Sequence, residues 1–123
     1  MQLKRKSNEK KRSSEWRLSR ESPSNLQLSV LEAHYRAGRI SDAEKLAKLL
    51  TNEFPNHPVA WKLLGILYKK AGHVSEALNT MKIAVQIAPK DAEANNNLGN
   101  TLGSVGKLGE AEVYLRRSIE LKP

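Results

Sequence analysis

The 123-residue chain has no cysteine, only 5% aromatic residues and no long apolar run. Without cysteine it forms no disulfide and offers no thiolate as nucleophile or metal ligand. No segment approaches the roughly 18 consecutive apolar residues that a membrane-spanning helix needs. The stretch from Met1 to Asn25 is almost entirely polar and does not resemble a secretory signal. The sequence therefore predicts one modest cytoplasmic folding unit.

Motifs for catalysis or cofactor binding are also missing. The only two aspartates, Asp42 and Asp91, precede predicted helices. The glycine-rich stretch 99–107 lacks the hydroxyl residue that follows the Gly-Lys pair of a phosphate-binding loop, because Leu108 stands there. The three histidines share no metal-ligand spacing: His34, His57 and His73. We therefore expect a chain that is not an enzyme, with no catalytic residue, no metal site and no cofactor.

Positive charge is concentrated at the start of the chain. Residues 1–24 carry eight basic residues against three glutamates, which gives +5 of the total net charge of +8. This segment has too few apolar side chains to offset the entropy lost on folding, so we expect a disordered basic tail over residues 1–24. Its basic clusters, Lys4–Lys6 and Lys10–Arg12, attract nucleic acid or anionic surfaces in some proteins. A solubilising leader is the favoured interpretation.

Beyond the tail, the sequence repeats with a period of 34 residues. The pattern is clearest in the middle of the chain: Trp61, Leu64, Gly65, Tyr68, Gly72, Ala77, Met81, Ala84 and Pro89. A shift of 34 residues toward the C-terminus brings these into register: Leu98, Gly99, Gly106, Ala111 and Pro123. The opposite shift aligns these: Gly38, Ala43 and Pro55. Two departures stand out in the last unit, at Asn95 and Ser118.

Each repeat is predicted to form two helices. The first four positions of the middle unit stand at i, i+3, i+4 and i+7, which is one stripe of an α-helix. Gly72 can end that helix in the left-handed backbone conformation. Ser75 is predicted to cap the second helix, as Ser41 with Glu44 would in the first unit, and Asp91 to cap the next helix. The larger residues of the stripe and its partner are predicted to be core: Trp61, Tyr68 and Met81.

This pattern resembles the tetratricopeptide repeat family. The resemblance implies an all-α, right-handed α-solenoid of about three helix-turn-helix units, at about 24–57, 58–91 and 92–123, in a domain of residues 25–123. The Asn-Asn-Leu-Gly run from Asn96 to Gly99 is similar to the superhelical arrays that precede bacterial O-linked N-acetylglucosamine transferase-like and sulfotransferase-like proteins.

The resemblance also implies a function as a protein-protein interaction scaffold. The first helices of such arrays line a concave groove that binds an extended peptide, here an acidic one. The matching positions are Tyr35, Arg36, Lys62, Ile66, Lys69, Lys70, Asn96, Asn97 and Asn100. The family's clamp for a terminal carboxylate is not reproduced, because its places hold Leu28, Glu32 and Leu63. Only Asn97 occupies the position of an asparagine ladder, and lysines on such a face are often merely solvated.

Arrays of this family usually end with an additional helix that covers the last pair. None follows Pro123 in the sequence, so we expect partial exposure of Leu115, Ile119 and Leu121. Two alternatives explain this pattern. The chain is the N-terminal segment of a larger modifying enzyme of the glycosyltransferase or sulfotransferase type, or it self-associates through its last helix.

Overall fold

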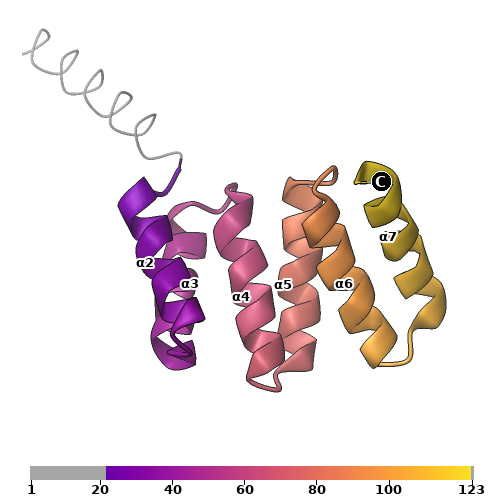
Figure 1. The fold of residues 1–123 in the computed structure, drawn as a ribbon, viewed down its shortest axis with the longest axis horizontal. Coiled ribbons are helices and arrows are strands. Elements are labelled where there is room, and N and C mark those ends of the chain that lie inside the picture. The colour runs from indigo at the N-terminus through magenta and orange to yellow at the C-terminus, as the bar shows by residue number, and fades with distance from the viewer. Residues whose placement is uncertain (1–21, 123) are drawn as a thin grey trace, which may run out of the picture.

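The structure is a computed structural model that describes residues 22–122 and contains no strand within that range. Six helices follow one another: α2 (Asn25–Arg36), α3 (Ile40–Glu53), α4 (Pro58–Lys70), α5 (Val74–Ile87), α6 (Ala92–Ser104) and α7 (Leu108–Leu121). They stand side by side in an extended row (Figure 1). The predicted all-α solenoid of helix pairs is confirmed. The predicted disordered tail covers residues 1–24, of which residues 1–21 lie outside the described residues, while Ser24 is the N-cap residue of α2.

A glycine at the same place in every unit reverses the chain between paired helices. Gly38, Gly72 and Gly106 have φ angles of 76°, 82° and 83°. This left-handed backbone conformation is readily accessible only to glycine, because a Cβ atom would clash there. The prediction for Gly72 is confirmed, and its two equivalents make the same turn.

Asp91 caps α6, as its position before the helix predicts. Its Oδ1 accepts hydrogen bonds from the backbone amides of Glu93 and Ala94, at 3.0 and 3.3 Å. At the start of α2, the Ser24 hydroxyl accepts from the amide of Gln27, whose side chain accepts from the Ser24 amide. This is a complete capping box, in the unit where the sequence pattern is weakest.

The predicted caps at Ser41 and Ser75 are wrong. The helices α3 and α5 begin at Ile40 and Val74, one residue before the serine in each case, so each serine lies inside the first turn rather than before it. Neither helix has a side-chain cap hydrogen bond at its N-cap residue. A hydroxyl inside the first turn no longer has the extended backbone that lets a cap reach the next amides. These two helices therefore depend on packing.

Paired helices approach most closely at a second glycine position. A Cβ atom on Gly65 would lie 2.7 Å from Cγ of Met81, and one on Gly99 would lie 2.7 Å from Cγ of Leu115. Real Cβ contacts are not that short, so both positions require glycine for this spacing of helices. The expected close approach at Gly65 is confirmed.

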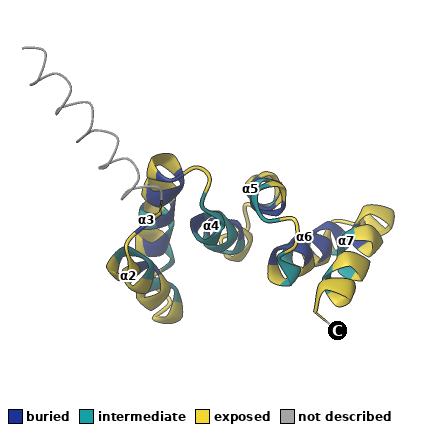
Figure 2. Cartoon of the chain, turned by 90° about the horizontal axis from the view of Figure 1, so that it is seen from above, coloured by how far each residue is buried: buried dark blue, intermediate teal, exposed yellow. Residues whose placement is uncertain are grey.

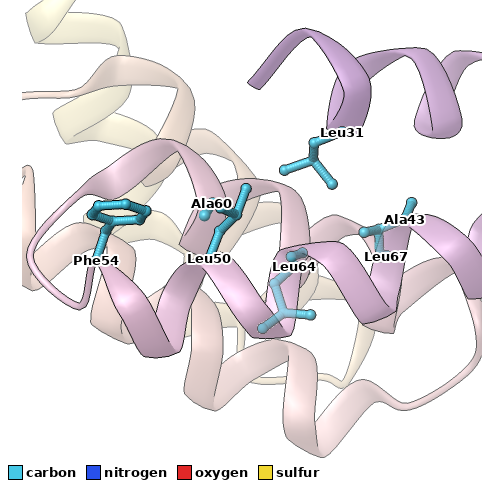
Figure 3. Packing of buried hydrophobic residues seen from close by; sticks show 8 residues of the cluster. Leu31, Ala43, Leu50, Phe54, Ala60, Leu64 and Leu67 are labelled. Carbon is cyan, nitrogen blue, oxygen red and sulfur yellow. The ribbon is translucent and has the colours of Figure 1, made fainter. Parts of the chain in front are cut away.

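The core consists of two hydrophobic clusters. The first joins α2, α3 and α4 (Figure 3): Leu31, Ala43, Ala47, Leu50, Phe54, Ala60, Leu64 and Leu67. The second joins α5, α6 and α7: Ala77, Met81, Val85, Ala94, Leu98, Leu102 and Ala111. Tyr68 packs against both clusters. Met81 is buried as predicted, and Tyr68 is half-buried but packs against the core, whereas Trp61 is half-buried and belongs to neither cluster. Trp61 and Tyr68 each have a polar group, the indole N–H and the phenolic hydroxyl, that needs a hydrogen-bond partner when the side chain is buried.

Asn95 departs from the repeat in residue type but keeps its hydrogen bond. The indole Nε1 of Trp61 donates to the carbonyl of Pro55 at 2.9 Å. One repeat later, Nδ2 of Asn95 donates to the equivalent carbonyl of Pro89 at 3.1 Å and also to the carbonyl of Asp91 at 2.8 Å. The asparagine is fully buried. Asn95 therefore makes the same hydrogen bond to the loop before its helix as Trp61 makes one repeat earlier.

The second departure, Ser118, lies in α7. Its hydroxyl donates a 2.8 Å hydrogen bond to the carbonyl of Ala92, at the start of α6. The equivalent residue in α5 is Ala84, which is buried and makes no such bond. The serine thus exchanges a packing contact for a polar link between the two helices of the last unit.

Candidate interaction surface

The nine residues predicted to line the groove all lie on first helices. Tyr35 and Arg36 lie near the end of α2, and three asparagines lie on α6. On α4, Lys62, Ile66 and Lys69 occupy i, i+4 and i+7, a stripe that lies roughly a third of a turn around the helix from the stripe of Trp61, Leu64 and Tyr68. Seen from above, α2 and α6 lie on one side of the array and α3 and α5 on the other (Figure 2). Binding by these nine residues stays a prediction.

Lys62 is engaged within the chain. Its Nζ lies 2.8 Å from Oδ2 of Asp91 and 3.4 Å from Oε2 of Glu93, and only 16% of its side chain is exposed. Burial lowers the pKa of Lys62, but the hydrogen bond to Asp91 and the charge of Glu93 outweigh it, so the pKa is raised. Burial raises the pKa of Asp91, but the hydrogen bond and positive charge of Lys62 and the backbone amides of α6 outweigh this effect, so the pKa of Asp91 is lowered. The lysine ties α4 to the start of α6.

Two other basic residues also have partners. Nζ of Lys70 lies 4.8 Å from the ring centroid of Tyr35, a cation-π contact that connects α4 with α2. Arg36 lies 3.9 Å from Glu32 in an exposed pair. Lys69 is exposed and forms no ion pair with any residue in the range 22–122. Lys69 is therefore the cation of this stripe that a ligand can reach with least competition.

The asparagines of α6 form the polar part of the surface. Asn96 and Asn100 are exposed, while Asn97 is half-buried. Nδ2 of Asn97 is buried and has no hydrogen-bond partner among the described residues. Its backbone carbonyl accepts from the hydroxyl of Thr101 at 2.8 Å. A buried donor without an acceptor costs about 1–3 kcal/mol, and because Nδ2 of Asn97 is itself buried, the acceptor of a ligand can reach it only after the amide rotates.

Sequence reasoning missed the acidic partners of Lys62. Asp91 and Glu93 are 29 and 31 residues away along the chain, a separation with no periodic signal of its own. The signal that does exist is the 34-residue register, which places the start of each unit beside the first helix of the unit before it. Asp91 was predicted only as a helix cap, and the structure gives its two carboxylate oxygens separate partners.

Comparison with known proteins gives the helix pair its family. A family model described as tetratricopeptide repeat matches residues 92–123. The unit formed by residues 92–123 is a tetratricopeptide repeat. Protein O-mannosyl-transferase TMTC1 of Mus musculus is 26% identical over 102 residues, which cover 80% of this chain and 11% of the relative. The chain spans about a tenth of the length of the curated relatives it matches.

Two solved structures illustrate the shared tetratricopeptide architecture. The Thermobaculum terrenum O-GlcNAc transferase has a TM-score of 0.75 and 28% identity, with 80% of this chain and 19% of that chain covered. The Yersinia enterocolitica type III secretion chaperone SycD, in complex with a peptide of the translocator YopD, has a TM-score of 0.74 and 22% identity, with 79% and 74% covered. The match to SycD establishes the fold alone.

Other expectations concern absences and the tail. No helix within residues 22–122 is long and apolar enough to cross a membrane. The same range contains no group of three or more residues able to hold a metal ion together. The basic clusters predicted to attract nucleic acid lie outside the described residues. At the other end of the array, Ile119 and Leu121 are 66% and 37% exposed and Leu115 is half-buried, which agrees with the partial exposure expected for these three residues.

Proposed function

We propose that this tetratricopeptide array is a scaffold that binds an extended peptide segment of a partner protein across α2, α4 and α6. The observation that carries the proposal is the unpartnered Nδ2 of Asn97. An extended peptide offers a backbone carbonyl every few ångströms, and each is a suitable acceptor. When the amide of Asn97 turns toward such a carbonyl, the complex satisfies a donor that the free chain leaves unsatisfied.

The surroundings of Asn97 favour an acidic segment. Asn96 and Asn100 are exposed on the same helix, and Lys69 supplies an accessible positive charge on α4. Ile66 on α4 is the equivalent of Asn100 one repeat earlier. It is half-buried and offers an apolar contact. The SycD structure is described as a complex with a peptide of its partner YopD, which supports peptide binding as a use of this architecture. Amides would hold the peptide backbone, while Lys69 would select for negative charge.

An asparagine substitution with a matched control tests this proposal. Asn97→Ala should weaken binding of a fluorescein-labelled, ten-residue acidic peptide by about 5- to 10-fold, because one buried hydrogen bond is worth about 1–1.5 kcal/mol. Asn79→Ala removes an exposed asparagine from α5, on a second helix, and should leave binding unchanged. The side-chain amide signals of Asn97 in NMR spectra should shift on titration. Equal binding by both variants would locate the peptide elsewhere.

A second function rests on the relatives. We propose that the array is the substrate-docking segment of a larger modifying enzyme of the glycosyltransferase type, because both TMTC1 and the O-GlcNAc transferase carry a similar array within a much longer chain. The parent open reading frame tests this: a reading frame without a transferase domain contradicts it. We further propose a cytoplasmic location, since a chain without cysteine needs no oxidising compartment, and a fluorescent fusion tests the location.

A further inference from the structure

A groove of about 870 Å³ opens between α3 and α5, over α4. Its lining residues belong to α3, α4, α5 and the loop before α4. In Figure 2, α3 and α5 lie on the opposite side of the array from α2 and α6. The groove is thus separate from the surface described above, although α4 contributes to both. The lining residues used below are Lys45, Lys48, Leu49, Trp61, Tyr68 and Thr80.

The α5 wall of the groove is formed by a small residue, Thr80. One repeat later, the equivalent residue is Tyr114, which packs against the second core cluster. One repeat earlier it is Leu46, which packs against the first cluster. Thr80 has a short side chain and leaves the space between α3 and α5 unfilled. Of the three units, only the middle one has a residue too small to close this space.

The aromatic residues of the groove show the same contrast. Trp61 and Tyr68 are half-buried and line the groove, whereas their equivalents one repeat later, Asn95 and Leu102, are fully buried. The groove therefore follows the seam between the two core clusters, where Tyr68 contacts both. Half-buried aromatic rings in a concave site are typical of pockets that receive an apolar side chain.

The charge of the groove is positive. Its lining contains Lys45 and Lys48 and no acidic residue. Nζ of Lys48 lies 5.6 Å from the ring centroid of Tyr68 and 3.0 Å from a carboxylate oxygen of Glu44, which neutralises part of its charge. Lys45 is exposed and has no ion pair within residues 22–122. Leu49 is 50% exposed and extends the apolar floor toward the rim.

We propose that this groove is a second binding site, which takes a short acidic segment of a partner protein with one apolar side chain inserted against Trp61 and Tyr68. Carboxylates of the segment lie beside Lys45 and Lys48. The charge of the rim selects this occupant over the chain's own N-terminal segment, because residues 1–24 carry a net charge of +5 and would be repelled. A partner held here leaves the α2, α4 and α6 side free.

NMR spectroscopy can follow the groove through a single signal. The chain has two tryptophans, so in a Trp16→Phe background the only indole N–H signal belongs to Trp61. The titrant is a ten-residue peptide with aspartates on both sides of a central leucine, and its control has asparagine in place of every aspartate. The acidic peptide should shift the Trp61 indole signal and bind more weakly as salt is added. An equal shift with the asparagine peptide would overturn the proposal, as would no shift with either.

Matched substitutions place the peptide in the groove. Lys45→Glu should weaken binding by about 2- to 5-fold or more. Lys82→Glu makes the same charge change on α5 outside the groove lining and should have less effect. Thr80→Tyr should abolish binding by filling the groove as Tyr114 does one repeat later, and a thermal melt checks that this variant folds. If Lys45→Glu and Lys82→Glu weaken binding equally, the peptide senses only net charge and the groove is not its site.

The Asn97→Ala variant separates this proposal from the proposed function. It should leave the Trp61 response unchanged, because α6 residues do not line the groove. Failure of peptide binding on the α2, α4 and α6 side would not affect the groove, and the reverse also holds. Loss of the Trp61 response in Asn97→Ala would mean that both experiments report one site on the opposite side, and would overturn the second site.

Discussion

Asp91 is the residue whose replacement best tests how the units are joined. One carboxylate oxygen caps α6 and the other accepts from Lys62, so a single side chain has two separable roles. Asp91→Ala removes both roles. Asp91→Asn keeps an oxygen that can cap the helix, because asparagine is as good an N-cap as aspartate, but it loses the charge. The two variants therefore divide the total effect into a cap contribution and an ion-pair contribution.

The expected magnitudes follow from the geometry. Loss of an N-cap costs about 1 kcal/mol of unfolding free energy. The pair of Lys62 and Asp91 has side chains 16% and 25% exposed, which places it between exposed pairs, worth at most about 1 kcal/mol, and buried pairs, which cost about 3–5 kcal/mol to break. Glu93, at 3.4 Å, compensates in part. We expect losses of about 2–3 kcal/mol for Asp91→Ala and about 1–2 kcal/mol for Asp91→Asn.

The same pair gives a defined pH dependence. The folded-state pKa of Asp91 is lowered, so its contribution to stability is present above the unfolded pKa of about 4 and is lost as pH falls through the folded pKa. The folded-state pKa of Lys62 is raised, so its contribution is present below the ordinary value of 10.5 and is lost only as pH rises beyond it. Between these limits the pair contributes a constant amount.

Chemical denaturation followed by circular dichroism measures these quantities. A double-mutant cycle of Asp91→Asn with Lys62→Met, at neutral pH and at about pH 2.5, isolates the pair. The coupling energy should be about 1 kcal/mol at neutral pH and should shrink on acidification. Lys48→Met, which breaks the exposed pair with Glu44, is the control and should leave the stability nearly unchanged. A coupling energy near zero at neutral pH would refute the role assigned to Lys62.

Four further substitutions test the fold by thermal or denaturant unfolding. Gly99→Ala should cost about 1–3 kcal/mol, because its Cβ would meet Leu115 at 2.7 Å; a stability equal to wild type would show that the helices part freely. Gly106→Val should cost at least about 1–2 kcal/mol, since a β-branched residue is strained at a φ of 83°, and an unchanged melting temperature would contradict that conformation. Ser24→Ala should cost about 1 kcal/mol of stability and Ser75→Ala less than about 0.5 kcal/mol. A larger loss for Ser75→Ala than for Ser24→Ala would mean that Ser75 caps α5, contrary to the structure.

The repeat made much of the fold predictable from sequence. Gly72 could be assigned a left-handed conformation because residues with the same requirement recur 34 positions away on both sides. Gly65 could be assigned a close helix approach because a glycine recurs 34 positions later, at Gly99, although Leu31 stands 34 positions earlier. The caps at Ser41 and Ser75 could not be placed correctly, because the register fixes a turn within one or two residues while a cap depends on the exact residue at which the helix begins.

The candidate sites were predictable only in part. The stripe of Lys62, Ile66 and Lys69 follows from helical spacing, but spacing does not reveal whether a lysine is free. Lys62 is held by acids from the next unit, whereas Lys69 is exposed, and the two have the same appearance in sequence. The groove beside Thr80 was missed because a space between three helices is a property of packing, and no motif marks it.

A repeat protein contains its own comparisons, and they bear on which departures from the pattern matter. Asn95 and Ser118 depart in residue type, yet each is accounted for by a hydrogen bond to a backbone carbonyl. Thr80 is different. Its equivalents Leu46 and Tyr114 both pack against a core cluster, whereas the region around Thr80 is left open beside two exposed aromatic edges. Because Thr80 is itself only 6% exposed, a tyrosine there reaches the groove only if its neighbours shift, which opposes the gain from added apolar burial. A Thr80→Tyr protein that is as stable as wild type but no longer binds the acidic peptide would therefore show that threonine serves binding rather than folding at this position.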